Sequence, residues 1–209
     1  WIVLALEIVS LISGYFQYDL LQTAANGGEI SIESADSNDT REQLIGVIFM
    51  IVYIISAVTF IQWFRRAYYN LHQRVNHLSQ TEGWAAGSWF VPIVSLYRPY
   101  QIMKELYQET KELLVKKGVS LNENFATDSV GWWWTLWIIN NVIGQFVFRY
   151  SLKAESIDEF TTSTIASMIG NVVGILLSII TVKVIKDYAN VEPLLFEIKE
   201  EEEETTTSA

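Results

Sequence analysis

The sequence predicts an all-α, polytopic membrane protein with four transmembrane helices in one domain. Half of its 209 residues are hydrophobic, and most gather in runs of about 20, the length needed to cross a bilayer. Polar stretches separate these runs, and cytosolic amphipathic helices are predicted where apolar residues repeat at helical spacing. A shorter apolar run in the middle of the chain is interrupted by proline, which predicts a broken or re-entrant central segment.

The first two spans are predicted at residues 1–21 and 44–64. The first run is apolar apart from a few polar residues that include Glu7, and the second contains no charged residue. Residues 22–42 are rich in Gly, Asn, Ser, Asp and Glu, which is typical of a solvated loop. The second helix is expected to continue past residue 64, because the apolar residues that follow keep to one helical face: Ala67, Tyr68, Leu71, Val75 and Leu78.

The central segment, residues 84–98, is apolar but too short to cross a bilayer easily. Pro92 removes a backbone donor from its middle, and a broken helix survives in lipid only where protein or water satisfies the freed groups. The segment is therefore expected to dip into the bilayer and return, or to sit packed within the bundle. A kinked span and a buried helix of the soluble type are the alternatives. Trp84 and Trp89 suit the headgroup level.

An amphipathic helix is predicted at residues 99–117. Pro99, which follows Arg98, is well placed to open it, because proline suits the first position of a helix. The apolar residues fall on one side, with Lys and Glu on the other: Ile102, Met103, Leu106, Tyr107, Leu113 and Leu114. Such a helix is expected to lie on the membrane surface or on a neighbouring helix. A polar linker at residues 119–130 follows.

The third and fourth spans are predicted at residues 131–149 and 162–182. The third opens with four tryptophans in six positions, which indicates an interfacial anchor: Trp132, Trp133, Trp134 and Trp137. The chain is interpreted as one membrane domain, residues 1–191, followed by an acidic tail at residues 192–209. The tail cannot build a core and is expected to be disordered.

The basic residues predict the orientation of the spans. Of the 14 Lys and Arg residues, eleven lie on the side that holds the loop after the second span and the chain after the fourth, and three lie on the other side. Basic residues accumulate on the cytoplasmic side of membrane proteins. Both termini are therefore expected in the cytosol, with residues 22–42 on the outside.

Small and polar residues predict how the last two spans pack. Gly170 and Gly174 belong to a stripe of small residues at four-residue spacing, which permits close helix approach. Asn140 or Asn141 of the third span is expected to bond to Asn171 of the fourth, because their depths match across the hairpin. Such bonds contribute on the order of 1 kcal/mol, and a packing role is favoured over a ligand site.

Glu7 lies within the first predicted span. A carboxylate at that position costs roughly 2.5–3.5 kcal/mol unless it is protonated or paired. One interpretation is a proton or cation relay. The other is that Trp1 marks the interface, so that Glu7, about 9 Å along the helix, reaches water or a polar neighbour.

The sequence predicts no catalytic residue, no cofactor and no metal site. The chain has no cysteine, which excludes disulfides, thiolate metal sites and cysteine nucleophiles. His72 and His77 are five residues apart, which differs from the four-residue spacing that places two metal ligands on one helical face. The formal net charge of −10 argues against nucleic acid as a partner.

One pattern in the chain is distinctive: Trp-Phe-Arg-Arg-Ala-Tyr at 63–68, Gly-Trp at 83–84, Trp-Phe-Val-Pro at 89–92 and Arg-Pro-Tyr-Gln-Ile-Met at 98–103. It resembles a family of bacterial multi-pass membrane proteins catalogued only as a domain of unknown function. The resemblance is specific over residues 60–107 and looser elsewhere. It implies a bacterial cytoplasmic membrane protein with about four spans and no assigned activity. The candidate motif residues are Arg65, Trp84, Trp89, Pro92, Arg98 and Pro99.

For function, the sequence favours an accessory or scaffold subunit in the lipid bilayer, without catalysis of its own. Its partner is expected to be another membrane protein or a second copy of itself. The surface helices and the charged tail favour this hypothesis. The alternative is a small transporter or channel-like protein that uses the broken segment, Glu7 and the asparagines, because broken helices often line transport sites.

Overall fold

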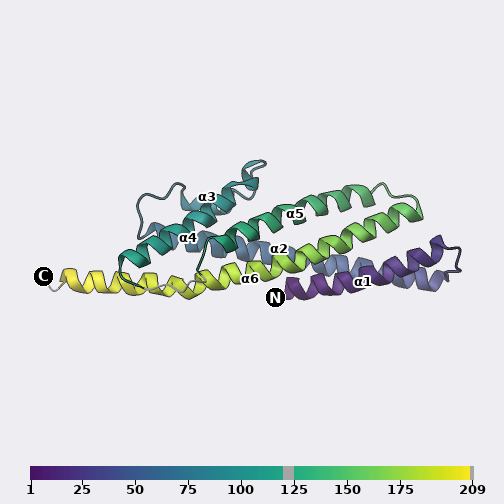
Figure 1. The fold of residues 1–209 in the computed structure, drawn as a ribbon, viewed down its shortest axis with the longest axis horizontal. Coiled ribbons are helices and arrows are strands. Elements are labelled where there is room, and N and C mark those ends of the chain that lie inside the picture. The colour runs from purple at the N-terminus through teal and green to yellow at the C-terminus, as the bar shows by residue number, and fades with distance from the viewer. Residues whose placement is uncertain (120–124, 208–209) are drawn as a thin grey trace. The chain divides into compact units, whose positions relative to one another are not determined.

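In the computed structural model, every regular element of the described chain is helical (Figure 1). The structure describes residues 1–119 and 125–207, with side chains as far as Leu195. The prediction of an all-α fold is confirmed for this part of the chain. Its elements are α1 (Ile2–Ala25), α2 (Ile32–His72), α3 (Glu82–Gly87), the 3₁₀ turn η1 (Val94–Leu96), α4 (Arg98–Lys116), α5 (Asp128–Ser151) and α6 (Ile157–Thr207).

Among the described residues, three helices are long and apolar enough to cross a membrane: α1, α2 and the Ile157–Leu195 part of α6. The protein is therefore a membrane protein. The helix α5 has 24 residues but is not one of the three. Its tryptophans and its Asn and Gln side chains make it less apolar than the others.

The described chain divides into two compact units. Unit 1 comprises residues 1–56 and 135–179, and unit 2 comprises residues 57–134 and 180–209. The helices α2, α5 and α6 each contribute residues to both units.

The interior of unit 1 is made of small and polar side chains. Its buried residues are Glu7, Ser13, Gly14, Asn38, Ser163, Thr164 and Gly174. Large apolar side chains face outwards instead, including Met50 (57% exposed), Val142 (65%) and Phe148 (64%). Helices in lipid lack a hydrophobic drive toward one another, so small residues and polar bonds hold them together. This pattern is the one expected of a helix bundle surrounded by lipid.

A polar contact joins the middle of α1 to α2. The hydroxyl of Ser13 donates to the carboxylate of Glu42 at 2.5 Å, and Nε of Arg41 donates to Ser13 Oγ at 2.8 Å. Residues 22–42 were expected to form a solvated loop, and this is wrong for most of the stretch, because α2 already begins at Ile32. Helix capping, packing and polar bonds to α1 outweigh the loop-like composition here.

The turn between α5 and α6 is short and ends in a reciprocal helix cap. The backbone N–H and the hydroxyl of Ser156 donate to the Glu159 carboxylate, at 3.0 and 3.1 Å. In return, the Glu159 N–H donates to Ser156 Oγ at 3.3 Å. This is a capping box, which fixes the start of α6. The backbone N–H groups of Glu155 and Ser156 and the Ser156 hydroxyl lower the pKa of Glu159.

Unit 2 has an interior of the opposite kind, formed by large apolar side chains. The predicted apolar faces of α2 and α4 meet there, and Phe64, Tyr68, Met103 and Leu106 are fully buried. Further fully buried residues come from α2, α4, α5 and α6: Ala67, Leu71, Ile102, Leu114, Val130, Val184 and Leu195. The predicted extension of the second helix is thus confirmed as far as His72, whereas Val75 and Leu78, predicted on the same helical face, lie beyond the end of α2. The helix α4 packs against neighbouring helices.

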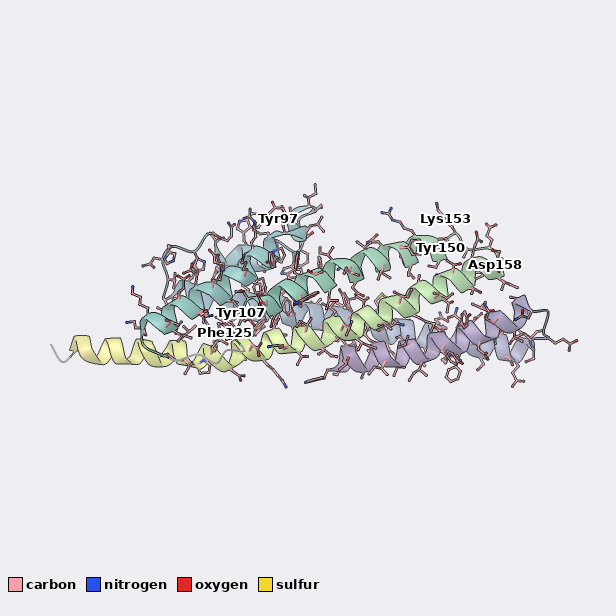
Figure 2. The ribbon with its side chains drawn as sticks, viewed as in Figure 1. Tyr97, Tyr107, Phe125, Tyr150, Lys153 and Asp158 are labelled. Carbon is pink, nitrogen blue, oxygen red and sulfur yellow. The ribbon has the colours of Figure 1, made fainter. Side chains whose placement is uncertain are left out.

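Within unit 2, a ring contact joins α4 to the segment before α5, and a hydrogen bond joins α4 to α6. The rings of Tyr107 and Phe125 stack at 4.6 Å between centroids (Figure 2). The Tyr107 hydroxyl donates to the carbonyl oxygen of Val184 at 2.6 Å. Burial raises the pKa of Tyr107 above its ordinary value, because the charged form would lose its hydration.

The predicted interfacial anchor of tryptophans needs correction. Trp133 and Trp134 are only 2% and 8% exposed and belong to the core of unit 2, whereas Trp132 is 65% exposed. The interfacial anchor is therefore smaller than predicted.

The boundary expected at residue 192 falls within α6. Glu192 and Leu195 are buried, so ordered packing continues at least as far as Leu195. The helix runs to Thr207. The rest of the predicted tail lies outside the part of the chain whose side chains are described, and so do residues 120–124 of the predicted linker.

Candidate functional site

The central segment is broken into two short helical pieces joined by turns. After α3, the chain forms turns from Ser88 to Ile93 and then η1, and it enters α4 at Arg98. We refer to residues 88–97 as the central loop. The predicted break is present, since no continuous helix runs through residues 84–98.

One side of the central loop is fixed to helices of unit 2. The indole of Trp89 packs against the rings of Phe60, Trp133 and Trp134, with centroids 5.8, 6.3 and 6.0 Å away. At the other end of the loop, Trp134 Nε1 donates to the carbonyl oxygen of Leu96 at 3.2 Å. Both ends of the loop are therefore held by the first turns of α5.

The tip of the loop is a strained turn. Ile93 has a φ of +66° and a ψ of −49°, and the Val94 N–H donates to the Pro92 carbonyl oxygen at 2.8 Å. This is a γ-turn with a positive φ, a rare and strained conformation. A β-branched residue is especially unfavourable there, and strain of this kind costs about 1–3 kcal/mol. Pro92 therefore takes part in a turn at the surface.

The apolar side chains of this turn point away from the protein. Phe90 and Ile93 are each 75% exposed and Leu96 is 54% exposed. A fixed backbone thus presents three large apolar side chains at its surface. Exposed apolar groups gathered in this way mark contacts with a protein or a membrane.

The other motif residues stabilise the surroundings of the loop. Arg65 of α2 bonds to Glu82 of α3 at 3.2 Å. Arg98 donates to Gln101 at 3.2 Å and lies over the Tyr97 ring. Pro99 is buried in the first turn of α4, one residue after the helix begins. Trp84, predicted for the headgroup level, lies in α3 and is 39% exposed.

A polar cluster that the sequence did not reveal holds the connection between α2 and α3. The buried Tyr68 hydroxyl donates to Glu105 Oε2 at 2.6 Å, and the Ser79 N–H donates to Glu105 Oε1 at 2.8 Å. The His72 ring donates to the Gln80 carbonyl oxygen at 2.8 Å. Burial, and then the bond to Glu105, raises the pKa of Tyr68.

The sequence pattern indicated that Glu105 belongs to a solvated face of α4. The faces of a single helix give no sign that a tyrosine 37 residues away will reach such a carboxylate. The contact between Tyr68 and Glu105 could have been predicted only from a polar residue of α4 placed opposite the apolar face of α2. We interpret the cluster as structural, because its hydrogen bonds hold the segment between α2 and α3 in place.

Glu7 is the buried ionisable residue of unit 1. It is 6% exposed and lies directly against Gly174 of α6, where a methyl group on the glycine would collide with the carboxylate. Tyr53 of α2 lies close enough to Glu7 for the two side chains to interact electrostatically. The predicted role of Gly174 in close packing is therefore supported, although the helix that packs on it is α1 and not the preceding span. Gly170 approaches α5, with a methyl group of Ile143 3.2 Å from the position a Cβ would take.

The expected asparagine pair does not form. Asn141 is exposed and donates to the carbonyl oxygen of Trp137 in its own helix at 2.8 Å. Within the described residues, no hydrogen bond joins Asn140 to Asn171. An asparagine in a helix can bond to a carbonyl oxygen one turn back, and this local bond replaces the one across the hairpin.

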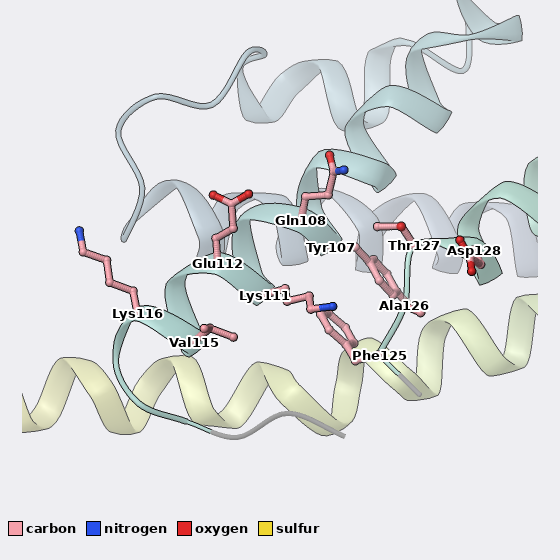
Figure 3. Close-up of a pocket in the computed structure, with 10 residues that line it drawn as sticks. All are labelled: Tyr107, Gln108, Lys111, Glu112, Val115, Lys116, Phe125, Ala126, Thr127 and Asp128. Carbon is pink, nitrogen blue, oxygen red and sulfur yellow. The ribbon is translucent and has the colours of Figure 1, made fainter. Parts of the chain in front are cut away.

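A surface cleft of about 680 Å³ lies between α4 and residues 125–128 (Figure 3). Lys111, Glu112 and Asp128 are among its lining residues, so charges of both signs surround it. The chain that connects its two walls passes through residues 120–124, outside the described part. Within the described chain, no group of three His, Cys, Asp or Glu side chains is placed to hold a metal ion.

Comparison with known proteins places the chain in a family. The model of the domain of unknown function DUF4328 matches residues 26–190. The chain belongs to this family. The match includes α2 to α5, the central loop and most of α6, whereas the whole of α1, with Glu7, precedes it. No curated protein and no solved structure matches the chain.

Proposed function

We propose that this DUF4328 protein crosses a bacterial cytoplasmic membrane four times, with unit 2 and both termini in the cytosol. The outward-facing apolar residues of α5 support a fourth span, because Val142, Phe146 and Phe148 are 65%, 48% and 64% exposed. No residue of α5 from Thr135 onward is buried. The excess of Lys and Arg on the side of unit 2 supports the orientation.

The central loop then lies at the cytosolic surface of the bilayer and is partly inserted. Phe60 belongs to the predicted second span, and Trp133 and Trp134 open the third. Because Trp89 packs on these three rings, the loop has the depth of the span ends. Its Phe90 and Ile93 side chains lie at the depth of the boundary between headgroups and acyl chains.

The function that this geometry supports best is that of an accessory or scaffold subunit for another membrane protein. The observation that carries the proposal is the central loop, in which a strained, fixed backbone exposes Phe90, Ile93 and Leu96. Rigid apolar and aromatic side chains of this kind act as anchors in protein interfaces, because little conformational entropy is lost on binding. A second copy of the chain is the other partner that such a loop accommodates.

Native mass spectrometry of the gently extracted protein tests the proposal. We expect a stoichiometric partner that is lost in the double variant Phe90→Ser and Ile93→Ser. The matched control is Phe148→Ser, at an exposed phenylalanine of α5, and it should keep the partner. A photoreactive phenylalanine analogue at position 90 should crosslink to that same partner. Adducts with lipid alone, or an unchanged stoichiometry in the double variant, would contradict the proposal.

Transport is the second candidate, and the position of Glu7 favours it. A buried carboxylate inside a span is a recurrent element of proton and ion pathways. The test is ion or proton flux in proteoliposomes, with Glu7→Gln as the comparison. Flux that is present in the wild type and absent in Glu7→Gln would support transport, and the absence of any flux above that of empty liposomes would end this candidate.

A further inference from the structure

The contacts of Glu7 determine its depth in the membrane, which the sequence alone left open. Tyr53 lies nine residues after the start and eleven before the end of the predicted span 44–64. Gly174 lies twelve residues after the start and eight before the end of the span 162–182. At about 1.5 Å per residue, these positions are roughly 12–18 Å from either end of a span. Glu7 therefore lies near the middle of a hydrocarbon core of about 30 Å.

The surroundings of Glu7 offer little to compensate a negative charge. Its side chain packs against Gly174, which has no side chain to donate a hydrogen bond. The helix α6 carries no ionisable side chain between Phe160 and Val182, and Tyr53 is the titratable group that faces Glu7 from α2. Within the described residues, no basic side chain forms a hydrogen bond or an ion pair with Glu7.

We infer that Glu7, seated on Gly174, is a proton-binding site in the middle of the membrane. A proton needs only one carboxylate oxygen, whereas hard metal cations require about six oxygen ligands. The two Glu7 oxygens and the Tyr53 hydroxyl fall short of that number, and no acidic cluster surrounds them in the described chain. The proton therefore fits this site better than a metal ion.

Occupancy of the site controls how α1 packs on α6. The neutral acid fits the dry contact with the glycine, so α1 stays against α6 when the proton is bound. Loss of the proton places a charge between the two helices and favours their separation or the entry of water. This site is independent of the docking role of the central loop, and it remains a proton site whether or not the protein transports ions.

Labelling with dicyclohexylcarbodiimide, an apolar reagent that modifies protonated carboxyl groups in membranes, tests the inference. The full chain is reconstituted in vesicles of bacterial phospholipid and labelled over a series of pH values. Mass spectrometry of the α1 peptide should show modification of Glu7 that decreases several-fold as the pH rises. The modification should be absent in Glu7→Gln and unaffected by sodium. Modification that does not change with pH would overturn the inference, and protection by sodium would replace the proton with a cation.

Infrared difference spectra provide a second measurement that does not depend on access of the reagent. The wild type should show the carbonyl band of a protonated carboxyl group, which disappears at high pH and is missing from Glu7→Gln. Glu42→Gln is the control, because Glu42 is a partly exposed carboxylate beside Arg41, and it should keep the band. The absence of a Glu7-dependent band at every pH would overturn the inference. Neither measurement depends on ion flux or on a partner protein. Failure of this inference can therefore be distinguished from failure of either functional proposal.

Discussion

Units 1 and 2 share the helices α2, α5 and α6 but have opposite interiors. In unit 1 the buried residues are glycine, serine, threonine, asparagine and one glutamate, and the large apolar side chains face outwards. In unit 2 the buried residues are mainly aromatic and aliphatic, and Tyr68, Tyr107 and Tyr188 are the largest of the fully buried side chains. The same α2 and α6 therefore change from one mode of packing to the other along their length.

In the proposed topology, the contrast follows from a change of solvent between lipid around unit 1 and water around unit 2. Water drives large apolar side chains into a core, whereas lipid exerts no such drive and leaves close packing and polar bonds to hold helices together. A substitution should therefore have different consequences in the two units even when the residue type is the same. The predictions below test this comparison, from the largest expected effect to the smallest.

The largest difference is expected for leucine truncation. Leu106 is fully buried in unit 2, and Leu176 is 50% exposed in unit 1. Leu106→Ala should lower the free energy of unfolding by about 2–5 kcal/mol through lost burial and a cavity. Leu176→Ala should change it by less than about 0.5 kcal/mol. Denaturation in mild detergent, followed by tryptophan fluorescence and circular dichroism, measures both, and equal losses would contradict the comparison.

The sensitive positions of unit 1 should be its glycines. Gly174→Ala places a methyl group against the Glu7 carboxylate, and we expect a loss of about 1–3 kcal/mol in the free energy of unfolding. The matched control is Gly144→Ala, where a methyl group meets open space, and it should be neutral or stabilise by up to about 1 kcal/mol. Adding Glu7→Ala to Gly174→Ala should recover part of the loss. Independent effects in this double-mutant cycle would refute the contact.

The buried tyrosines should make unit 2 sensitive to alkali. Burial raises the pKa of Tyr107. The contribution of this tyrosine to stability is therefore constant below its unfolded pKa of about 10. It falls as the pH rises above that value, until the pKa of the folded state is reached. Tyr107→Phe should make this fall less steep by up to about 1.4 kcal/mol per pH unit. Urea titrations at a series of pH values measure the slope. The control is Tyr15→Phe, at a tyrosine of unit 1 that is 58% exposed, and a slope equal to that of this control would disprove the prediction.

The smallest effect is expected at the tip of the central loop. Ile93→Gly relieves the positive φ, and we expect a gain of about 1 kcal/mol in the free energy of unfolding. Ile93→Val keeps both the β-branch and the strain, so its stability should stay close to that of the wild type. If the loop is a docking element, Ile93→Gly should bind the partner less well while being the more stable protein. A destabilised Ile93→Gly would show that the strain is absent.

The sequence by itself determined the helical class, the membrane location, the break in the central segment and the apolar faces of α2 and α4. Each of these depends on local composition or on the helical period, which neighbouring residues define without knowledge of their partners. The family was also recognisable from residues 63–103, and the DUF4328 match confirms it. The local signals failed at the start of α2, where packing and polar bonds to α1 outweighed a loop-like composition.

Only the tertiary structure decided which residues meet. It placed Glu7 against Gly174, left Asn141 bonded within its own helix, and joined Tyr68 to Glu105. It also moved Trp133 and Trp134 from an expected interface into a core. These contacts depend on the distance and rotation between helices, which no single helix encodes in its own sequence. The two opposite interiors arise for the same reason, because each is defined by residues that several helices contribute together.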